Sequence, residues 1–473
     1  MQAMKRHQAR VPAMMKTSLL LTLTSVLQAP VAAQTLNEVV VSASRASQRS
    51  FDAPAAIQSV DRATIEGAGA QVNLSESLNR VPGLTILSRQ NYAQDLQVSI
   101  RGFGARSAFG IRGIRLLVDG IPATTPDGQG LGSSISLTST ERMEVLRGPL
   151  AQMYGNSSGG VIQAFTRDAP ATPELLAAAY TGSFGLRRTD WQYAGRVGRY
   201  GLVADYSTFD IDGFRDNSRT ERKQFNGKLS FDANEATRVN VVFNRFDMPP
   251  AQDPAGLTQA QMEADPTQAP SPQARPDVTA FQIDSSDEIV VASSSGGSTT
   301  YKNAPGTRRT GWELSGSTWF SPHWRASLAA SQIDASYAQA FTNGATAVAA
   351  GNKMPGIPQS FLFSELLWTQ RPGAPGSKAQ AAGSQAGIEL TRAGRLYAND
   401  TNTASADGYA TLNLKASHVW VLAAGQLTTY ARMDNLTDKR YVGSVIVNQA
   451  GSQFYEPAPG RNWTLGVRLV MPL

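Results

Sequence analysis

The chain has 473 residues, 42 glycines, no cysteine and a formal net charge of +6. The absence of cysteine excludes a disulfide-stapled fold. The basic residues are scattered, and no cluster interleaves them with aromatic side chains, so the charge does not indicate nucleic-acid binding. Three histidines, without a metalloprotease, serine-hydrolase or phosphate-loop motif, give no basis for predicting catalytic residues, a metal site or a cofactor.

Residues 1–33 have the three parts of a secretory signal peptide. Lys16 is basic, residues 19–27 form a short apolar core, and small residues precede a cleavage position after Ala33. The apolar core is shorter than the roughly 18 residues that a membrane-spanning helix needs. The sequence therefore predicts an exported protein.

Residues 34–50 form a polar lead segment with one apolar, β-branched island. An extended segment of this kind can add as an edge strand to a partner's sheet, with the backbone carrying the affinity. The alternative is that the island is the first strand of the next domain. The island consists of Glu38, Val39, Val40, Val41, Ser42 and Ala43.

Residues 51–168 form a glycine-rich region in which short aliphatic strands alternate with glycines. Each glycine permits a tight turn or a close backbone approach that a Cβ would prevent. Arg101 and Arg147 each directly precede a glycine at the end of such a strand. A glycine-rich soluble α/β domain would also have these features.

From residue 172 to residue 473 the pattern changes to alternating strands separated by polar turns. Tyr200, Leu202 and Tyr206 fall on one face of such a strand, whereas Val203 and Asp205 fall on the other. Alternation over about ten residues, with aromatic side chains near strand ends, is typical of transmembrane β-barrels. Soluble β-sandwiches alternate as well, so this pattern alone leaves both folds open.

The order of motifs in the glycine-rich region resembles the plug domain of TonB-dependent outer-membrane receptors. The motifs are IRG (100–102), LLVDGIP (116–122), EVLRGP (144–149), MYG (153–155) and SGGVI (158–162). Residues 73–130, 285–314 and 432–463 are similar, more narrowly, to the YncD-type receptors for pyrroloquinoline quinone. The resemblance implies an α+β plug domain (51–168) followed by an antiparallel transmembrane β-barrel (172–473).

The resemblance also implies a function. Such a receptor binds an extracellular ligand, here pyrroloquinoline quinone, and imports it to the periplasm by TonB-coupled transport, without being an enzyme. The island 38–43 is then the TonB box. The implied partners are TonB, indirectly ExbB and ExbD, the small ligand, outer-membrane lipid and the barrel-assembly machinery, with the receptor a monomer. A ferric-siderophore receptor of the same fold is the alternative ligand class.

The barrel is predicted to be shortened. Family barrels have about 22 strands, which need about 220 residues for the membrane belt before loops are added. Only 305 residues follow Asp168, and the resemblance steps from early-barrel to late-barrel sequence near residues 270–280. We therefore expect fewer than 22 strands and an incomplete barrel, which leaves a truncated, non-transporting outer-membrane protein as a competing interpretation. A secreted soluble β protein with an adhesive role is a third.

Loops that follow three plug strands are the candidate ligand site. Arginine offers paired hydrogen bonds to carboxylates, and an aromatic side chain offers a face to a planar ring. We expect Arg89, Tyr92 and Arg106 to converge on one cationic, aromatic pocket. Arg101 and Arg147 are instead expected to couple plug and barrel, because the family pairs such arginines with acids of the barrel wall. The predicted ligand-binding residues are Arg89, Asn91, Tyr92, Arg106, Phe109 and Gln129.

Overall fold

The computed structural model describes most of the chain after residue 55. Of the predicted TonB box it describes the backbone of Val40–Val41 (β1), which pairs with Gln48–Arg49 (β2), while the rest of the box and the predicted signal peptide lie outside the described residues. The described residues are 40–41, 48–49, 56–87, 90–107, 110–124, 129–148, 154–155, 157–234, 237–248, 251–270, 273–274, 288–295, 298–304, 306–343, 346–370 and 382–473.

The N-terminal domain is a small α+β unit. A five-stranded mixed sheet has the order β3-β8-β9-β6-β7, in which β6 and β9 are parallel and the other neighbours are antiparallel. Asp61 caps the first helix by accepting a hydrogen bond from the Thr64 amide at 2.9 Å. The bounds are β3 Ala56–Asp61, α2 Arg62–Ala68, α3 Ser75–Leu78, β4 Leu84–Leu87, β5 Gln97–Ile100, β6 Ile114–Val118, β7 Ile121–Pro122, β8 Thr140–Arg147 and β9 Gly160–Thr166.

An apolar core holds this domain together, with Leu74 of the α3 segment, Leu116 of β6, Met143 of β8 and Ile162 of β9 almost completely buried. The strands that carry these residues are those that the glycine-rich motifs predicted. The α+β plug of the predicted fold class is therefore confirmed.

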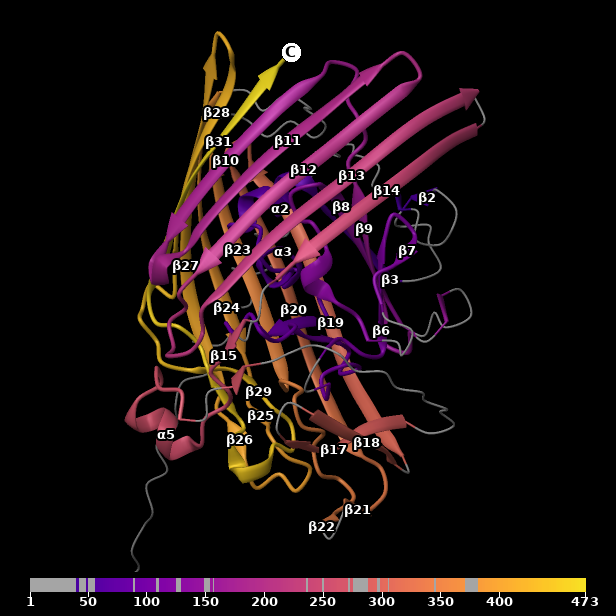
Figure 1. Cartoon of the computed structure of the whole chain (residues 1–473). Helices are drawn as coiled ribbons and strands as arrows, with labels where there is room; N and C mark the ends of the chain where they lie inside the picture. Colours follow the sequence, from indigo (N-terminus) through magenta and orange to yellow (C-terminus); the bar gives the residue numbers. More distant parts are fainter. Residues whose placement is uncertain are drawn as a thin grey trace, which may run out of the picture. The chain divides into compact units, whose positions relative to one another are not determined.

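The C-terminal part is dominated by long antiparallel strands. Within the described residues, twelve strands form one sheet with the order β14-β13-β12-β11-β10-β31-β28-β27-β24-β23-β20-β19, so that the last strand of the chain pairs with β10 (Figure 1). The bounds are β10 Glu174–Gly182, β11 Arg187–Val197, β12 Tyr200–Ile211, β13 Thr220–Asn234, β14 Thr237–Asp247, β19 Thr307–Ser321, β20 Trp324–Tyr337, β23 Ser360–Thr369, β24 Gly383–Ala393, β27 Tyr409–Leu422, β28 Gly425–Asp434 and β31 Asn462–Pro472.

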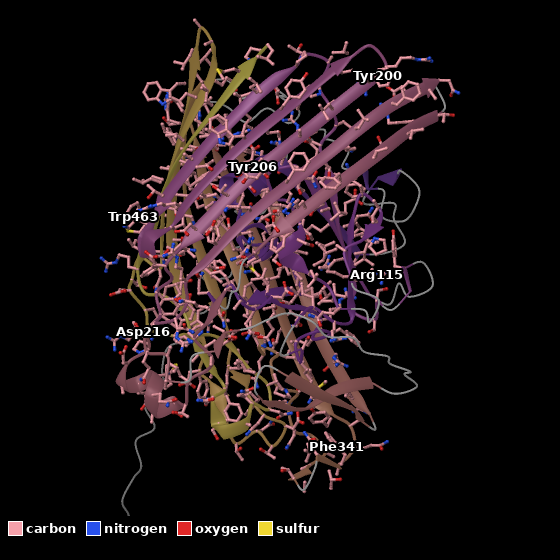
Figure 2. The ribbon with its side chains drawn as sticks, in the orientation of Figure 1. Arg115, Tyr200, Tyr206, Asp216, Phe341 and Trp463 are labelled. Carbon is pink, nitrogen blue, oxygen red and sulfur yellow. The ribbon has the colours of Figure 1, made fainter. Side chains whose placement is uncertain are left out.

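The two faces of this sheet have the reverse of a soluble protein's polarity. On the outer face, Tyr200 is 59% and Trp191 is 62% exposed, whereas on the inner face Asp205 is 1% and Glu389 is 3% exposed. Figure 2 labels Tyr200 and Tyr206 along β12 and Trp463 at the start of β31. Apolar side chains outside and polar side chains inside are what a transmembrane barrel requires. The soluble β-sandwich alternative is therefore wrong.

The two ends of the sheet differ in their connections. Tight turns join Val197 to Tyr200, Ser321 to Trp324 and Leu422 to Gly425, and we call this the short-turn end. Long connections at the other end, the long-loop end, contain short elements. These are β15 Gln252–Asp253, α5 Gln259–Ala264, β16 Gln273–Ala274, β17 Glu288–Ser295, β18 Ser298–Ala304, β21 Phe341–Asn343, β22 Thr346–Val348, β25 Leu396–Tyr397, β26 Ser405–Ala406, β29 Val442–Val445 and β30 Tyr455–Pro457.

Strands β14 and β19 are the edges of the sheet, and among the described strands neither has a second neighbour in it. Most side chains of β14 are exposed on both faces. The prediction of fewer than 22 strands is confirmed for the described part of the chain. The predicted junction at 270–280 falls largely outside the described residues, between β14 and β19. No helix within the described ranges is both long and apolar enough to cross a membrane.

Candidate functional site

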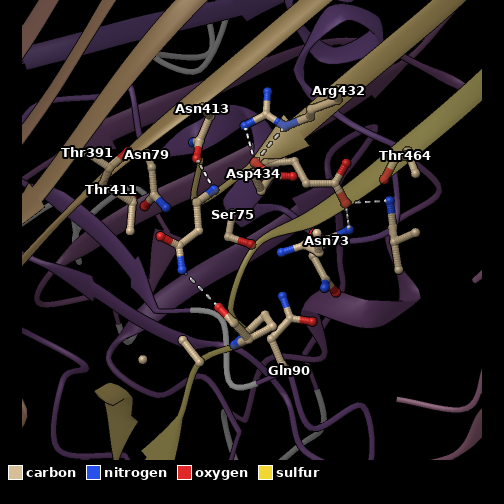
Figure 3. Close-up of a pocket in the computed structure, with 18 of the residues that line it drawn as sticks. Asn73, Ser75, Asn79, Gln90, Thr391, Thr411, Asn413, Arg432, Asp434 and Thr464 are labelled. Atoms are coloured by element: carbon tan, nitrogen blue, oxygen red, sulfur yellow. Dashed lines mark hydrogen bonds and ion pairs between the residues drawn. The ribbon is translucent and has the colours of Figure 1, made fainter. Parts of the chain in front are cut away.

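A cavity of about 260 Å³ lies between the plug and the inner face of the barrel, and we call it the plug–barrel pocket (Figure 3). Barrel strands β24, β27 and β28 contribute residues close to their long-loop ends, such as Thr391, Thr411 and Asp434. Hydroxyl, amide and aromatic side chains dominate the lining. The lining includes Asn73, Glu76, Asn79, Arg80, Gln90, Tyr92, Thr391, Tyr409, Thr411, Asn413, Arg432, Asp434, Tyr441 and Trp463.

The plug wall of the pocket is rigidly hydrogen-bonded. The Glu76 carboxylate accepts from the backbone amides of Gln71 at 2.7 Å and of Val72 and Asn73 at 2.8 Å. Burial raises the pKa of Glu76, although these backbone donors oppose the rise. Asn79 is fixed in the same way, because its side chain both donates to the Ile86 carbonyl and accepts from the Ile86 amide.

The barrel wall of the pocket carries charges that are already paired. Arg432 donates to Asp434 at 2.8 Å and to Glu389 at 2.8 Å, and Lys415 lies 2.8 Å from the other oxygen of Glu389. Asn413 accepts from the backbone amide of Asn435 at 2.9 Å. The charge of Arg432 in this wall is therefore balanced by carboxylates of the protein itself.

Of the predicted ligand residues that the structure describes, Tyr92 lines this pocket, together with Gln90 two residues before it. Its ring packs against Phe209 of β12, with centroids 5.1 Å apart, and burial raises the pKa of the phenol. Asn91 is buried beside the pocket and donates to Asp253 at 2.8 Å. Gln129 accepts from Arg112 at 3.1 Å.

Arg106 does not join Tyr92, so the expected convergence is wrong. Its guanidinium donates to Asp400 at 2.7 Å and to the Tyr337 hydroxyl, far along the sheet from the β12 strand that Tyr92 contacts. Arg106 is 6% exposed, and the loop between β24 and β27 supplies its carboxylate partner, Asp400. Arg89 and Phe109 lie outside the described residues.

Arg101 and Arg147 meet at one barrel carboxylate, Glu313 of β19. Arg101 donates to Glu313 Oε1 at 2.8 Å, and Arg147 donates to Glu313 Oε2 at 2.7 Å and to the Pro82 carbonyl at 2.8 Å. The hydrogen bond to Glu313 raises the pKa of Arg101, whereas burial lowers that of Arg147. The structure therefore contains the arginine–barrel pairing that the resemblance implied, while its coupling role stays a prediction.

The sequence interpretation missed Glu313, Asp400 and Arg432. A signal existed for Glu313, which lies between Trp312 and Leu314 in an alternating strand and therefore had to face inward. Asp400 lies in a loop and had no such signal. In the described part of the chain, no group of three or more histidines, aspartates or glutamates is arranged to hold a metal ion.

Two family models match the chain. The TonB-dependent receptor plug domain matches residues 49–161, and the TonB-dependent receptor-like β-barrel matches residues 277–436. Between them they cover more than half of the sequence.

Curated relatives match this chain over about a quarter of their own length. A hemin receptor of Yersinia enterocolitica is 31% identical over 189 residues, which is 37% of this chain and 26% of the relative. The vitamin B12 transporter BtuB of Photobacterium profundum is 31% identical over 180 residues, or 37% of this chain and 28% of the relative. The pesticin receptor of Yersinia pestis is 33% identical over 179 residues, 37% of this chain and 26% of the relative. The match thus spans about a quarter of each relative.

Solved structures share the fold. The ferric preacinetobactin receptor BauA of Acinetobacter baumannii aligns with a TM-score of 0.63 at 11% identity, covering 90% of this chain and 97% of that one. The unliganded ferric citrate transporter FecA aligns with a TM-score of 0.57 at 14% identity, covering 89% and 98%. The plug motifs, the reversed polarity of the sheet and these matches assign the chain to the TonB-dependent receptors, as an outer-membrane protein with a plug domain and a β-barrel domain.

Proposed function

We propose that the protein captures a small extracellular ligand in the plug–barrel pocket and imports it to the periplasm by TonB-coupled transport. The observation that carries the proposal is the position of this pocket, which both domains line close to the long-loop end. In bacterial outer-membrane barrels the long loops are extracellular and the short turns periplasmic. A ligand arriving from outside would therefore contact the plug and the barrel at the same time.

The lining supports a ligand that is rich in hydrogen-bonding groups and has a flat or aromatic part. Tyr92, Tyr409, Tyr441 and Trp463 supply ring faces, and Asn79, Asn413 and Thr411 belong to the polar part. A cavity of about 260 Å³ is below the roughly 300–1,000 Å³ of common ligand sites, so it would hold one portion of a larger molecule. A corrinoid or a ferric chelate meets this description.

Pyrroloquinoline quinone is the less favoured ligand. As a planar polycarboxylate it needs free cations, whereas Arg432 is paired with Asp434 and Glu389, and Arg106 is paired with Asp400 outside the pocket. The relatives named above are receptors for hemin, vitamin B12 and pesticin. We therefore rank the siderophore, hemin and corrinoid class above the quinone.

Residues 38–43 are proposed to engage TonB. Val40–Val41 is already extended and forms a two-residue ladder with Gln48–Arg49, which supports strand addition by this segment. Arg101 and Arg147 are proposed to couple the plug to the barrel through Glu313. ExbB and ExbD would act through TonB, and the receptor is proposed to be monomeric.

A calorimetric titration of the purified protein with hemin, cyanocobalamin, a ferric siderophore and pyrroloquinoline quinone tests the ligand class. Thr411→Trp fills the pocket, whereas Ala410→Trp places the same side chain on the outer face of β27. The proposal expects one of the first three ligands to bind, with binding weakened at least about tenfold by Thr411→Trp only, since the pocket would lose its volume. Equal binding by both variants would place the site elsewhere.

Among the described strands, the edges β14 and β19 have no further partner, and this favours a second candidate, an outer-membrane protein that binds without transporting. A lipid-exposed sheet edge is not stable in a membrane. Uptake of radiolabelled ligand by cells that express this chain in place of their own receptor separates the candidates. Binding without energy-dependent accumulation would favour the second.

A further inference from the structure

A second cavity, of about 190 Å³, shares strands β23, β24, β27 and β28 with the plug–barrel pocket and also reaches Trp319 of β19 and Arg325 of β20. It is lined by Glu365 of β23, Gln385 of β24, Ser417 of β27 and Tyr430 of β28, and by Thr64 of the plug helix α2. Along β27, Tyr409, Thr411 and Asn413 line the plug–barrel pocket, and residues 415–417 line the second one, as the strand runs toward its short turn. The second cavity, here the lower pocket, is therefore nearer the short-turn end.

A cluster of charged side chains separates the two pockets. Lys415 lies 2.5 Å from Glu365 and 2.8 Å from Glu389, and Arg432 lies 2.8 Å from the other oxygen of Glu389. Arg80 approaches from the plug, with its Nη1 3.8 Å from Glu365. We call these five residues the ion cluster. Arg80 is its member from the plug and lines both pockets.

Several buried polar atoms in and beside the cluster have no hydrogen-bond partner among the described residues. Two of them are Nη1 of Arg432 and the hydroxyl of Tyr430, which lie two residues apart on β28 and therefore face the same way. Arg432 lines the plug–barrel pocket and Tyr430 lines the lower pocket. Buried polar atoms of this kind are normally satisfied by water or by a bound polar molecule. This observation indicates a hydrated region that continues past the cluster.

We propose that the ligand's route follows the inner face of β23, β24, β27 and β28, from the plug–barrel pocket to the lower pocket, and that Arg80 closes it. The proposal rests on the transport function proposed above and adds the wall along which the ligand passes. In this arrangement, movement of the α2–α3 part of the plug withdraws Arg80 and joins the two pockets.

Withdrawal of Arg80 leaves the other charges of the cluster paired. Glu365 keeps Lys415 at 2.5 Å and Arg325 at 3.2 Å, and Glu389 keeps Lys415 and Arg432. The contact between Arg80 and Glu365, at 3.8 Å, is the longest of the three that Glu365 makes. The Arg80 guanidinium also lies 5.2 Å from the ring centroid of Phe363. Within the plug, Nε of Arg80 donates to the Ser77 carbonyl at 2.9 Å. Withdrawal of Arg80 therefore leaves no buried carboxylate without a cation, and this keeps the energetic cost of opening low.

Ion conductance of the full chain in planar lipid bilayers tests the route. The sequence has no cysteine, so single cysteines can be introduced and labelled in the same protein. Arg80→Gln removes the closing charge, and Arg62→Gln, on the same part of the plug but paired with Glu66, is the matched control. We expect the ion conductance of Arg80→Gln to be at least about tenfold above that of the wild type, because loss of the Arg80 charge shifts the closed–open equilibrium toward the open state. The conductance of Arg62→Gln should equal that of the wild type. Equal conductance in the two variants would overturn the proposal.

Cysteine modification then locates the conducting path. In the Arg80→Gln background, a methanethiosulfonate reagent should block the current through Ser417→Cys in the lower pocket. The same reagent should leave the current unchanged in Asn226→Cys, an inward position on β13, or in Asn244→Cys on the edge strand β14. Block at Asn226→Cys or Asn244→Cys, without block at Ser417→Cys, would place the path elsewhere and overturn the proposal.

Two further outcomes are decisive. Glu365→Gln provides a second way to weaken the cluster, and failure of both cluster variants to insert, while Arg62→Gln inserts, would make the cluster a folding element and refute the gate. The test needs no ligand, so it is separate from the transport proposal. A blockable path in a protein that imports nothing would refute transport, whereas import with no block at Ser417→Cys would refute only this route.

Discussion

Glu313 accepts hydrogen bonds from Arg101 and Arg147, so one barrel side chain anchors two plug strands. Gly83, with φ of +71°, lies so close that a Cβ there would collide with this carboxylate. Glu313→Gln should lower the free energy of plug unfolding by about 1–3 kcal/mol, because hydrogen bonds to charged groups contribute about that much. Limited proteolysis in increasing urea measures it. Asp334→Asn, which breaks an exposed pair with Lys353, is the control and should change little.

Glu66 links α2 to the barrel strand β31 and predicts a pH dependence. Burial tends to raise its pKa, but Arg468 at 2.5 Å and Arg62 at 2.7 Å lower it below the ordinary value of 4.5. A lowered folded-state pKa means that the contact stabilises the protein above about pH 4.5 and that this stability is lost as the pH falls further. The urea concentration at the unfolding midpoint of the wild type should fall as the pH is lowered from 6 to 3. A decline of the same size in Glu66→Gln would exclude Glu66 as its source.

The proposed TonB box is a short extended element whose backbone would pair with TonB. Val40→Pro removes a backbone donor from the extended segment and should block strand addition to TonB. Ligand binding to cells should persist while energy-dependent uptake is lost. Val40→Ala retains the backbone donor and should transport normally. Normal uptake by the proline variant would show that another segment contacts TonB.

The strands themselves were predictable, because their signals are local. Alternation separated outward Tyr200 and Tyr206 from inward Asp205, and the structure has this arrangement. The glycine motifs likewise marked the plug strands. A period of two is set by neighbouring residues, and it holds whatever the strand pairs with. The elements of the fold could therefore be read from short windows of sequence.

The pocket could not be read in this way. It joins Asn79 of the plug to Thr411 and Arg432, more than 300 residues away, and their meeting depends on strand register and on the seating of the plug. Arg106 shows the consequence, since its loop position indicated ligand contact, whereas its guanidinium donates to Asp400 and Tyr337. The alternation pattern predicted that inward-facing charges such as Glu313 have a partner inside the barrel. It did not identify that partner.

For the whole molecule, the decisive quantity is the number of strands around the plug. The described sheet has twelve strands, whereas plugged outer-membrane transporters have about 22. Barrel diameter grows roughly linearly with strand number, so closing β14 onto β19 would leave about half the diameter and about a third of the cross-section. A plug that matches the larger barrel cannot remain inside the smaller one. If the twelve described strands were the whole wall, the edges would either stay open around the plug or close and expel it.

A barrel domain with more strands should be able to close around the plug. Insertion of about ten consecutive barrel strands from a relative between β14 and β19 should yield a barrel that changes its electrophoretic mobility on heating and protects the plug from trypsin. The unmodified chain should show one of these properties without the other, since closure and an enclosed plug exclude each other at twelve strands. Both are measured on the same outer-membrane preparation. A heat-modifiable, fully plug-protected unmodified chain would mean that the twelve described strands can close around this plug.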